Sequence, residues 1–204
     1  MNVREAIYSR SSARFFRNVK IPRNIVIEIL NIARFAPSSK NAQPWRIIIV
    51  ENEDIKKKIA DASYGQEWIA SASMILVFLG DMEAYLREDL FSAFQTLVDL
   101  GIVSPSSNDL MNYISKCSDS EVKLARLLNC ILNVAVIIDH LTLLAVDYGL
   151  ATCWVRKFDA SKIRSMLNIP DKYVIVALLP LGYSEAKFLS KNRLSVDDIV
   201  IKWL

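Results

Sequence analysis

The sequence predicts a domain of the α+β class, in which helices cover a central β-sheet. Three short apolar runs suit buried strands, at residues 46–50, 74–79 and 173–179. Between them, apolar side chains recur at helical spacing, as in residues 23–35 and 121–148. At 204 residues the chain is long enough to bury its own core, so we expect one domain over residues 1–204.

Composition narrows the class of protein. Hydrophobic residues make up 52% of the chain and the mean hydropathy is +0.25, which predicts that apolar surface is buried against a second chain. The 25 basic and 22 acidic residues leave a formal charge of +3 and are scattered, which disfavours nucleic acid as a partner. Three cysteines without CxxC spacing, beside one histidine, suit neither disulfides nor zinc. We therefore expect a reducing, cytoplasmic location.

Local signals place the shorter helices. The N-terminus carries Arg4 and Glu5 where an export signal would need its apolar core, and residues 2–9 suit a helix instead. Pro22 begins the segment 23–35, Asn52 can cap a helix to about residue 62, and Asp159 can cap residues 160–167. In the second of these helices we expect a solvated face that carries three successive basic residues, Lys56, Lys57 and Lys58.

The longest helix is expected at residues 121–148, apolar on most faces and ended by Gly149. It is almost long enough to span a membrane, but Asn129, Asn133, Asp139 and His140 would be costly in hydrocarbon. We interpret it as a buried helix at the middle of the domain or of a dimer, with a structural histidine.

The remaining segments are less informative. Residues 82–117 show helical spacing around Leu86 and Leu90 that breaks at Gly101. The strand at 173–179 is closed by Pro180, a basic stretch follows at residues 187–193, and residues 195–204 form a polar tail.

Two polar segments suit a small-molecule ligand. Residues 9–14, Ser-Arg-Ser-Ser-Ala-Arg, place two guanidinium groups and three hydroxyls within six residues, a set suited to a phosphate monoester. A solvated helix end is the other interpretation, and composition leaves both open. The loop between the helix at 23–35 and the first strand offers hydrogen-bonding groups for a polar planar ligand: Ser38, Ser39, Asn41 and Gln43.

No side chains suggest a self-sufficient catalytic set. The sequence shows no Ser/His/Asp combination, no prominent carboxylate pair, and neither a G-x-G-x-x-G nor a P-loop string.

Several segments together resemble the nitroreductase family of FMN-dependent oxidoreductases. They are Arg-Ser-Ser-Ala-Arg at 10–14, Ala-Pro-Ser-Ser-Lys-Asn-Ala-Gln-Pro-Trp at 36–45, Gly-Leu-Ala-Thr-Cys-Trp-Val-Arg-Lys-Phe at 149–158, Leu-Pro-Leu-Gly-Tyr at 179–183 and Lys-Asn-Arg at 191–193. The resemblance implies a mainly antiparallel sheet of four or five strands flanked by helices, in an intertwined homodimer with two FMN sites at the interface. A flavoprotein also suits a chain without its own catalytic groups.

The resemblance implies the residues that hold FMN. The phosphate and the pyrimidine edge fall to Arg10, Ser11, Ser12 and Arg14, and the phosphate site is completed by Lys191 and Arg193. The loop with Pro37, Ser38, Ser39 and Asn41 would meet the flavin of the other subunit, and Gln66 would contact the ring unless it is an ordinary loop glutamine. Backbone N–H groups of Val155, Arg156 and Lys157 would face N5 and O4.

Two positions need comment. Arg14 is expected at the N1 and O2 edge of the flavin as an electrostatic group, with a second phosphate contact as the alternative. Lys157 stands where glycine is usual, which makes the geometry of its loop uncertain.

The implied reaction is ping-pong transfer of hydride from NADH or NADPH, through flavin N5, to a small electron-poor acceptor such as a nitroaromatic or a quinone. Three alternatives stay open. A protein of the same fold could catalyse reductive dehalogenation or the flavin-consuming synthesis of dimethylbenzimidazole, it could store or sense FMN without catalysis, or the chain could be a basic nucleic-acid-binding module. The residues identify neither the acceptor nor the preferred nicotinamide.

Overall fold

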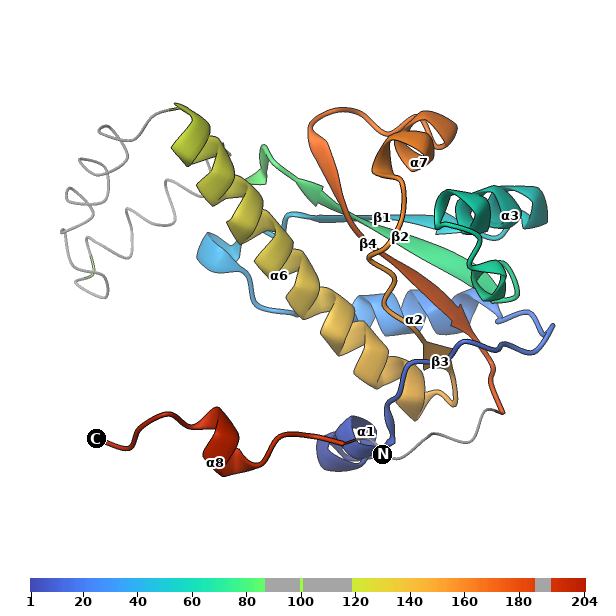
Figure 1. Cartoon of the computed structure of the whole chain (residues 1–204), viewed down its shortest axis with the longest axis horizontal. Helices are drawn as coiled ribbons and strands as arrows, with labels where there is room; N and C mark the ends of the chain where they lie inside the picture. The colour runs from blue at the N-terminus through green and yellow to red at the C-terminus, as the bar shows by residue number, and fades with distance from the viewer. Residues whose placement is uncertain (87–99, 101–118, 186–191) are drawn as a thin grey trace.

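The computed structural model describes residues 1–86, 100, 119–185 and 192–204, and Figure 1 shows their arrangement. Within these ranges an open, four-stranded antiparallel sheet lies between helices, which confirms the predicted α+β sandwich. The helical spacing expected between residues 87 and 117 lies outside the described residues, apart from Leu100.

The sheet has the strand order β1-β2-β4-β3. Its strands are β1 (Trp45–Val50), β2 (Met74–Asp81), β3 (Ala151–Thr152) and β4 (Tyr173–Gly182). Strand β2 is buried along its whole length and pairs with β1 on one side and β4 on the other. A central strand covered on both faces explains why its sequence is a continuous apolar run rather than an alternating one.

Alternate side chains of β2 enter two separate cores. Met74, Leu76 and Phe78 pack with α2 (Arg23–Ala33) and α6 (Asp119–Asp147) on one face of the sheet. Ile75, Val77 and Leu79 pack with α3 (Glu53–Ala62) and α7 (Ala160–Met166) on the other face. The two-residue period of a strand therefore divides one apolar run between two helical layers.

Strand β4 continues beyond its predicted end at residue 179. Leu181 pairs with Met74 of β2 and with Thr152 of β3, and Gly182 pairs with Ala151. Pairing on both sides holds residues 180–182 in the sheet, although proline normally marks the end of a strand.

The caps predicted at Asn52, Asp159 and Gly149 are present. Helix α1 (Val3–Ser9) also begins with a capping box between Asn2 and Glu5, which was not predicted. Asn52 accepts a hydrogen bond from the N–H of Ile55, and Asp159 caps α7 in the same manner. Beyond α6, Gly149 has a φ of +69°, a left-handed conformation that glycine adopts without steric cost.

Lys56 was predicted on a solvated face, and this is wrong. The residue is only 2% exposed, and its ammonium donates to the carbonyl of Ala72 at 2.6 Å and pairs with Glu53 at 2.9 Å. Burial is tolerated because the charge keeps these two partners, and the contact fixes the segment that leads into β2.

Helix α6 buries one face and exposes another. Val134, Ile138 and Leu141 belong to the core, whereas Leu124, Leu128 and Leu132 are exposed, so all-round burial is not met within one chain. Ile32, one of the regularly spaced apolar residues of α2, is also exposed, and so is His140, whose ring Nδ1 lies 3.0 Å from the Val136 carbonyl. By length and composition α6 is the one helix in the described ranges that could cross a membrane. Its packing identifies it here as a core helix.

The chain ends in an arm, residues 192–204, with the short helix α8 (Val196–Ile199). Although a polar tail was expected, six apolar side chains of this C-terminal arm are exposed: Leu194, Val196, Ile199, Ile201, Trp203 and Leu204. Three 3₁₀ turns complete the described elements: η1 (Ser39–Asn41), η2 (Glu67–Ile69) and η3 (Ala84–Leu86).

Candidate functional site

The basic segment at residues 10–14 lies along the short strand β3. Ser12 forms a parallel bridge with Thr152, and the N–H of Ala13 donates to the Thr152 carbonyl at 2.9 Å. Phe16 anchors the segment, because it is 3% exposed and its ring stacks with Trp68 at a centroid distance of 6.5 Å. Two segments separated by about 140 residues of sequence therefore share one edge of the sheet.

The thiol of Cys153 shows how closely the cations approach this edge. Burial raises the pKa of Cys153, while the positive charges of Arg14 and Arg10 and a hydrogen bond with Ser12 act to lower it. Effects of this kind arise from charges and hydrogen-bonding groups near the thiol, so Arg14, Arg10 and Ser12 lie in its neighbourhood. The structure thus brings three predicted site residues to the end of β3.

Gln66 joins a second predicted segment to the same region. Its side-chain Nε2 donates to the Ser63 carbonyl at 2.9 Å and to the Lys157 carbonyl at 3.2 Å. Both amide hydrogens are thereby used within the chain, and Oε1 is left as an acceptor. The sequence placed Gln66 near a ligand but did not indicate that it ties two loops together.

The turn after β3 accommodates lysine at the position where glycine is usual. Lys157 is absent from the described residues with positive φ, so the backbone here does not require glycine. The N–H of Val155 donates to the Leu178 carbonyl at 2.9 Å, and Leu178 donates back at 3.0 Å. Within the described ranges the N–H groups of Arg156 and Lys157 have no such partner, so these two remain for a ligand.

A small pocket of about 220 Å³ adjoins the basic segment. It is lined by Ser11, Val146, Gly149, Leu150, Ala151, Thr152 and Ser184. The hydroxyl of Ser11 is buried and has no hydrogen-bond partner among the residues that the structure describes. A buried hydroxyl without a partner is costly, which suggests that a bound molecule supplies one. Sequence reasoning missed Thr152 and Ser184, although both lie inside or directly after segments that it singled out.

The loop at residues 37–43 lies elsewhere. The N–H of Ser39 donates to the side-chain oxygen of Asn133 on α6 at 2.9 Å, which ties the loop to the helix. Three residues of the loop, Lys40, Asn41 and Gln43, have positive φ angles. Asn133 is 14 residues before the end of α6 at Asp147, and this stretch rises about 21 Å. In Figure 1 the loop lies beside the middle of α6, whereas β3 follows the far end of the helix. Pro37, Ser38, Ser39 and Asn41 are therefore not brought to the basic segment of their own chain.

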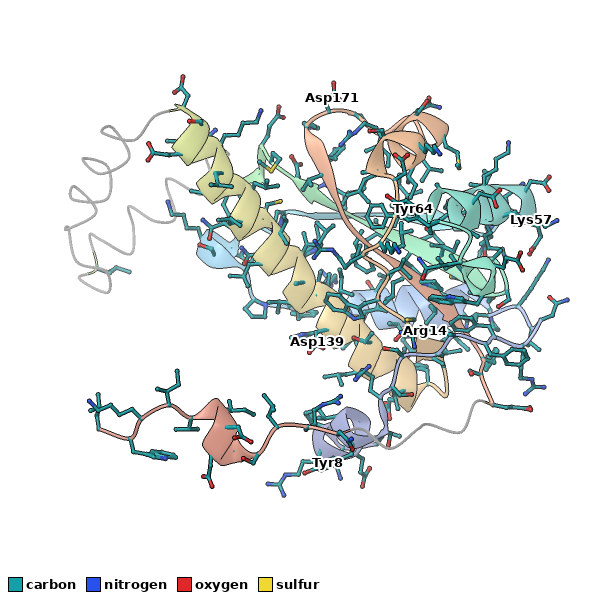
Figure 2. The ribbon with its side chains drawn as sticks, viewed as in Figure 1. Tyr8, Arg14, Lys57, Tyr64, Asp139 and Asp171 are labelled. Carbon is teal, nitrogen blue, oxygen red and sulfur yellow. The ribbon has the colours of Figure 1, made fainter. Side chains whose placement is uncertain are left out.

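Of the two phosphate ligands predicted near the C-terminus, the structure describes only Arg193. Lys191 lies outside the described residues. Arg193 is exposed on the C-terminal arm, where its guanidinium donates to the carbonyl of neighbouring Asn192 at 2.8 Å. Figure 2 shows Arg14 near the C-terminal end of α6.

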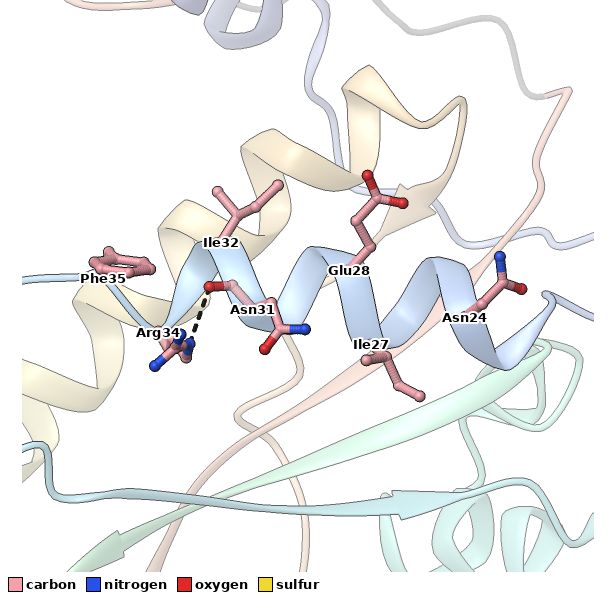
Figure 3. A pocket seen from close by; sticks show the side chains of 7 residues that line it. All are labelled: Asn24, Ile27, Glu28, Asn31, Ile32, Arg34 and Phe35. Carbon is pink, nitrogen blue, oxygen red and sulfur yellow. Dashed lines mark hydrogen bonds between the residues drawn. The ribbon is translucent and has the colours of Figure 1, made fainter.

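A larger hollow of about 620 Å³ lies on α2 and contains no predicted site residue. Its lining is Asn24, Ile27, Glu28, Asn31, Ile32, Arg34 and Phe35, which Figure 3 shows along the length of the helix. Ile27 and Phe35 are exposed there, so this is an apolar surface rather than an enclosed site.

The donor set at the end of β3 suits an anionic, planar ligand. Guanidinium groups and hydroxyls bind phosphate, backbone N–H groups bind ring oxygen or nitrogen, and the Gln66 carbonyl accepts from a ring N–H. No nucleophile with its own activating base takes part in these contacts.

Comparisons with known proteins identify the family. A model of the nitroreductase family matches residues 7–183. An oxygen-insensitive NADPH nitroreductase of Helicobacter pylori is 30% identical over 211 residues, which cover 98% of this chain and 96% of that protein. An NADH dehydrogenase of Thermus thermophilus is 27% identical over 98% of this chain and 96% of its own length.

Solved structures show the same fold. A protein from Exiguobacterium sibiricum, solved in complex with FMN, has a TM-score of 0.79 at 25% identity and covers 100% of this chain and 97% of that chain. A nitroreductase-like protein from Streptococcus mutans has a TM-score of 0.78 at 24% identity, covering 96% and 95%. The family model spans most of the sequence, and the chain therefore belongs to the nitroreductase family.

Proposed function

We propose that this protein is an FMN-dependent oxidoreductase that takes hydride from NADH or NADPH and reduces a small electron-poor acceptor, a nitroaromatic or a quinone, in ping-pong order. The observation that carries the proposal is the meeting of three segments at the end of β3: residues 10–14, residues 152–157 and Gln66. The nitroreductase named for NADPH and the FMN-bound neighbour support the same activity.

The residues present fit FMN. Arg10 and the hydroxyls of Ser11 and Ser12 suit a terminal phosphate, which would supply the partner that the Ser11 hydroxyl lacks among the described residues. The sequence has no dinucleotide fingerprint for an adenylate half, so FMN fits better than FAD. Arg193 and Lys191 add cations from the C-terminal end of the chain.

Bound FMN supplies two-electron hydride chemistry at N5, and the protein supplies its position and electrostatic environment. The N–H groups of Arg156 and Lys157 donate to the ring, and Oε1 of Gln66 accepts from it. Arg14 stabilises negative charge at the N1 and O2 edge, because a guanidinium stays protonated at physiological pH.

We further infer a homodimer in which the loop at residues 37–43 reaches the cofactor of the partner. Within one chain this loop is held by Asn133, about 21 Å along α6 from the end where β3 begins. A two-fold axis that crosses α6 at right angles between Asn133 and Asp147 would bring the loop of one chain to the end of β3 in its partner. The site is then complete only when two chains associate.

Exposed apolar surface supports association. Leu124, Leu128 and Leu132 recur every four residues and form one stripe on α6, and the C-terminal arm exposes further side chains, among them Trp203 at 85%. A monomer rarely leaves so much apolar surface in water. We expect an interface above about 2,000 Å², the range of obligate dimers. Both apolar cores share one sheet, so each subunit is proposed to be a single domain over residues 1–204.

Visible spectroscopy tests the function directly. The purified protein should be yellow, should release FMN on heating, and should bleach under anaerobic NADH or NADPH and regain colour when an acceptor is added. Parallel double-reciprocal plots would agree with ping-pong order. Chromatographic identification of FAD would contradict the cofactor assignment. A yellow protein that neither nicotinamide bleaches would instead be a flavin store or sensor.

Sedimentation tests the dimer. We expect one species of twice the chain mass that carries FMN at micromolar concentration. A stable, FMN-loaded monomer under these conditions would show that the loop at 37–43 is not shared between chains.

A further inference from the structure

We propose that the side chains of Arg156, Lys157 and Tyr64 form a subsite for the anionic group of the acceptor, and that the preferred acceptors are aromatic carboxylates. The inference rests on the proposed function, because it requires an acceptor bound beside the loops that hold the flavin. It concerns the side chains at 156 and 157, whereas the cofactor is assigned only their backbone N–H groups.

Tyr64 and Lys157 form a pair at the mouth of the site. The Lys157 ammonium lies 5.4 Å from the centroid of the Tyr64 ring, in the range of a cation–π contact. Tyr64 is 66% exposed and has a φ of +59°, a conformation that costs free energy for a residue with a side chain. The fold therefore presents an aromatic ring to solvent in a strained conformation, with a cation above it.

Gln66 fixes this pair relative to the rest of the site. Its amide bonds the carbonyls of Ser63 and Lys157, the residues directly before Tyr64 and at the base of the cation. The ring and the ammonium thus flank the same glutamine that is proposed to contact the flavin. Their positions do not depend on two independent flexible loops.

The positive charge at this point is not compensated within the described residues. Neither Arg156 nor Lys157 takes part in an ion pair there, and both side chains are exposed. The nearest acidic residue in sequence, Asp159, already accepts from the N–H groups of Ser161 and Lys162 and pairs with the Lys162 ammonium at 3.8 Å. Some of the other described cations do have acidic partners, as Arg46 has Asp81 at 3.3 Å and Arg17 has Glu185 at 3.2 Å.

An aromatic carboxylate matches both parts of this surface. Its ring can pack on Tyr64, and its carboxylate can accept from the guanidinium of Arg156 or the ammonium of Lys157. A neutral nitroaromatic gains only the ring contact. The cations could also meet the 2′-phosphate of NADPH, whose adenine could pack on Tyr64, and the nicotinamide preference measured below separates that assignment from the carboxylate.

Two matched acceptors test the proposal in the FMN-loaded dimer. We compare kcat/KM for 4-nitrobenzoate with that for 4-nitrobenzamide, which has the same ring and nitro group but no charge. Lys157→Gln and Arg156→Gln should each lower the ratio of these two values by about tenfold, the lower end for a hydrogen bond to a charged group. Lys162→Gln is the control, because that exposed lysine belongs to the next helix and pairs with Asp159. It should leave the ratio unchanged.

Calorimetry gives a readout that does not depend on turnover. Benzoate should bind the oxidised holoprotein more tightly than benzamide, and Lys157→Gln should remove the difference. FMN content and circular dichroism of each variant establish that it is folded and loaded. Tyr64→Leu should weaken both ligands, because the ring contact is common to them.

Distinct results would overturn this proposal or the proposed function. An unchanged nitrobenzoate to nitrobenzamide ratio in both variants removes the subsite. A changed NADPH to NADH preference with an unchanged acceptor ratio assigns the cations to the nucleotide and also overturns it. If the protein does not bind FMN or is not reduced by nicotinamide, the proposed function fails, and benzoate binding to the protein then reports on the subsite alone.

Discussion

Replacing Gly182 by alanine should damage the fold at the point where it supports the cofactor site. A Cβ at this position would lie 2.8 Å from Cδ1 of Phe16 and 3.2 Å from the backbone N of Ser73. Phe16 is almost fully buried and is held against Trp68, and the Ser73 hydroxyl is bound to the N–H of Ile21 at 2.8 Å. Neither neighbour can move away without breaking another contact.

The magnitude follows from two opposing effects. Overpacking of a filled core costs about 1–3 kcal/mol, whereas alanine in a strand gains about 0.5–1 kcal/mol over glycine. We therefore expect Gly182→Ala to lower the free energy of unfolding by about 1–2 kcal/mol. Because Phe16 anchors the segment that carries Arg14, FMN binding should weaken as well.

Urea unfolding of a double-mutant cycle measures the effect. Phe16→Leu alone should cost about 1–2 kcal/mol through lost packing, but it removes ring atoms that the new methyl would meet. The double variant should therefore be more stable than the sum of the single effects predicts, by about 1 kcal/mol. Gly65→Ala is the control. Its Cβ would meet nothing within 4 Å, so any cost arises from its φ of +72° and Phe16→Leu cannot relieve it.

Additive single effects, within about 0.5 kcal/mol, would show that the contact with Phe16 does not limit this position. A Gly182→Ala variant as stable as the wild type would refute the packing argument altogether.

Three further predictions concern the cofactor and the core. Arg14→Gln should lower the two-electron midpoint potential by about 30 mV for each ~1.4 kcal/mol of lost stabilisation. Anaerobic titration measures this potential. An unchanged potential together with greatly weakened FMN binding would show that Arg14 contacts the phosphate of FMN instead. Asn133→Leu removes the acceptor for the Ser39 N–H and should weaken FMN binding by about 1–3 kcal/mol, whereas an unchanged Kd would place the loop away from the cofactor. Burial raises the pKa of Cys130 from 9.0 to about 11, so the folded state holds this proton more tightly. Stability from this group is complete below pH 9 and is lost as the pH rises through 11, by about 2–3 kcal/mol. Between pH 8 and pH 11 the free energy of unfolding, measured with urea, should fall less for Cys130→Ala than for the wild type. An equal fall in both proteins would show that the Cys130 thiol is not responsible.

Local patterns were sufficient for most of the secondary structure. The caps at Asn52 and Asp159 and the left-handed Gly149 depend on hydrogen bonds and sterics within a few residues, so the sequence predicts them correctly. The apolar run of β2 predicted a buried strand, because a strand that is covered on both faces carries apolar side chains at successive positions.

Long-range contacts account for the errors. The ammonium of buried Lys56 is bound by the Ala72 carbonyl and by Glu53. Ala72 is 16 residues away in sequence, so the pattern of the helix could not predict that contact. The stripe of α6 is exposed within one chain, because periodicity reports that a face is apolar and does not report whether the same chain or a partner covers it.

The sequence by itself determined the fold class, the approximate positions of β1, β2, β4 and the longer helices, and the residue types that suit an anionic, planar cofactor. Only the tertiary structure decided how those residues meet. It placed Ser12 and Arg14 at the end of β3, used the N–H of Val155 in a bridge to β4, and tied Gln66 to the carbonyl of Lys157. It also kept the loop at residues 37–43 away from the other site residues of its own chain. The physical reason is that capping and hydrophobic period depend on neighbours in sequence, whereas a binding site depends on which strands pair and which loops their ends bring together.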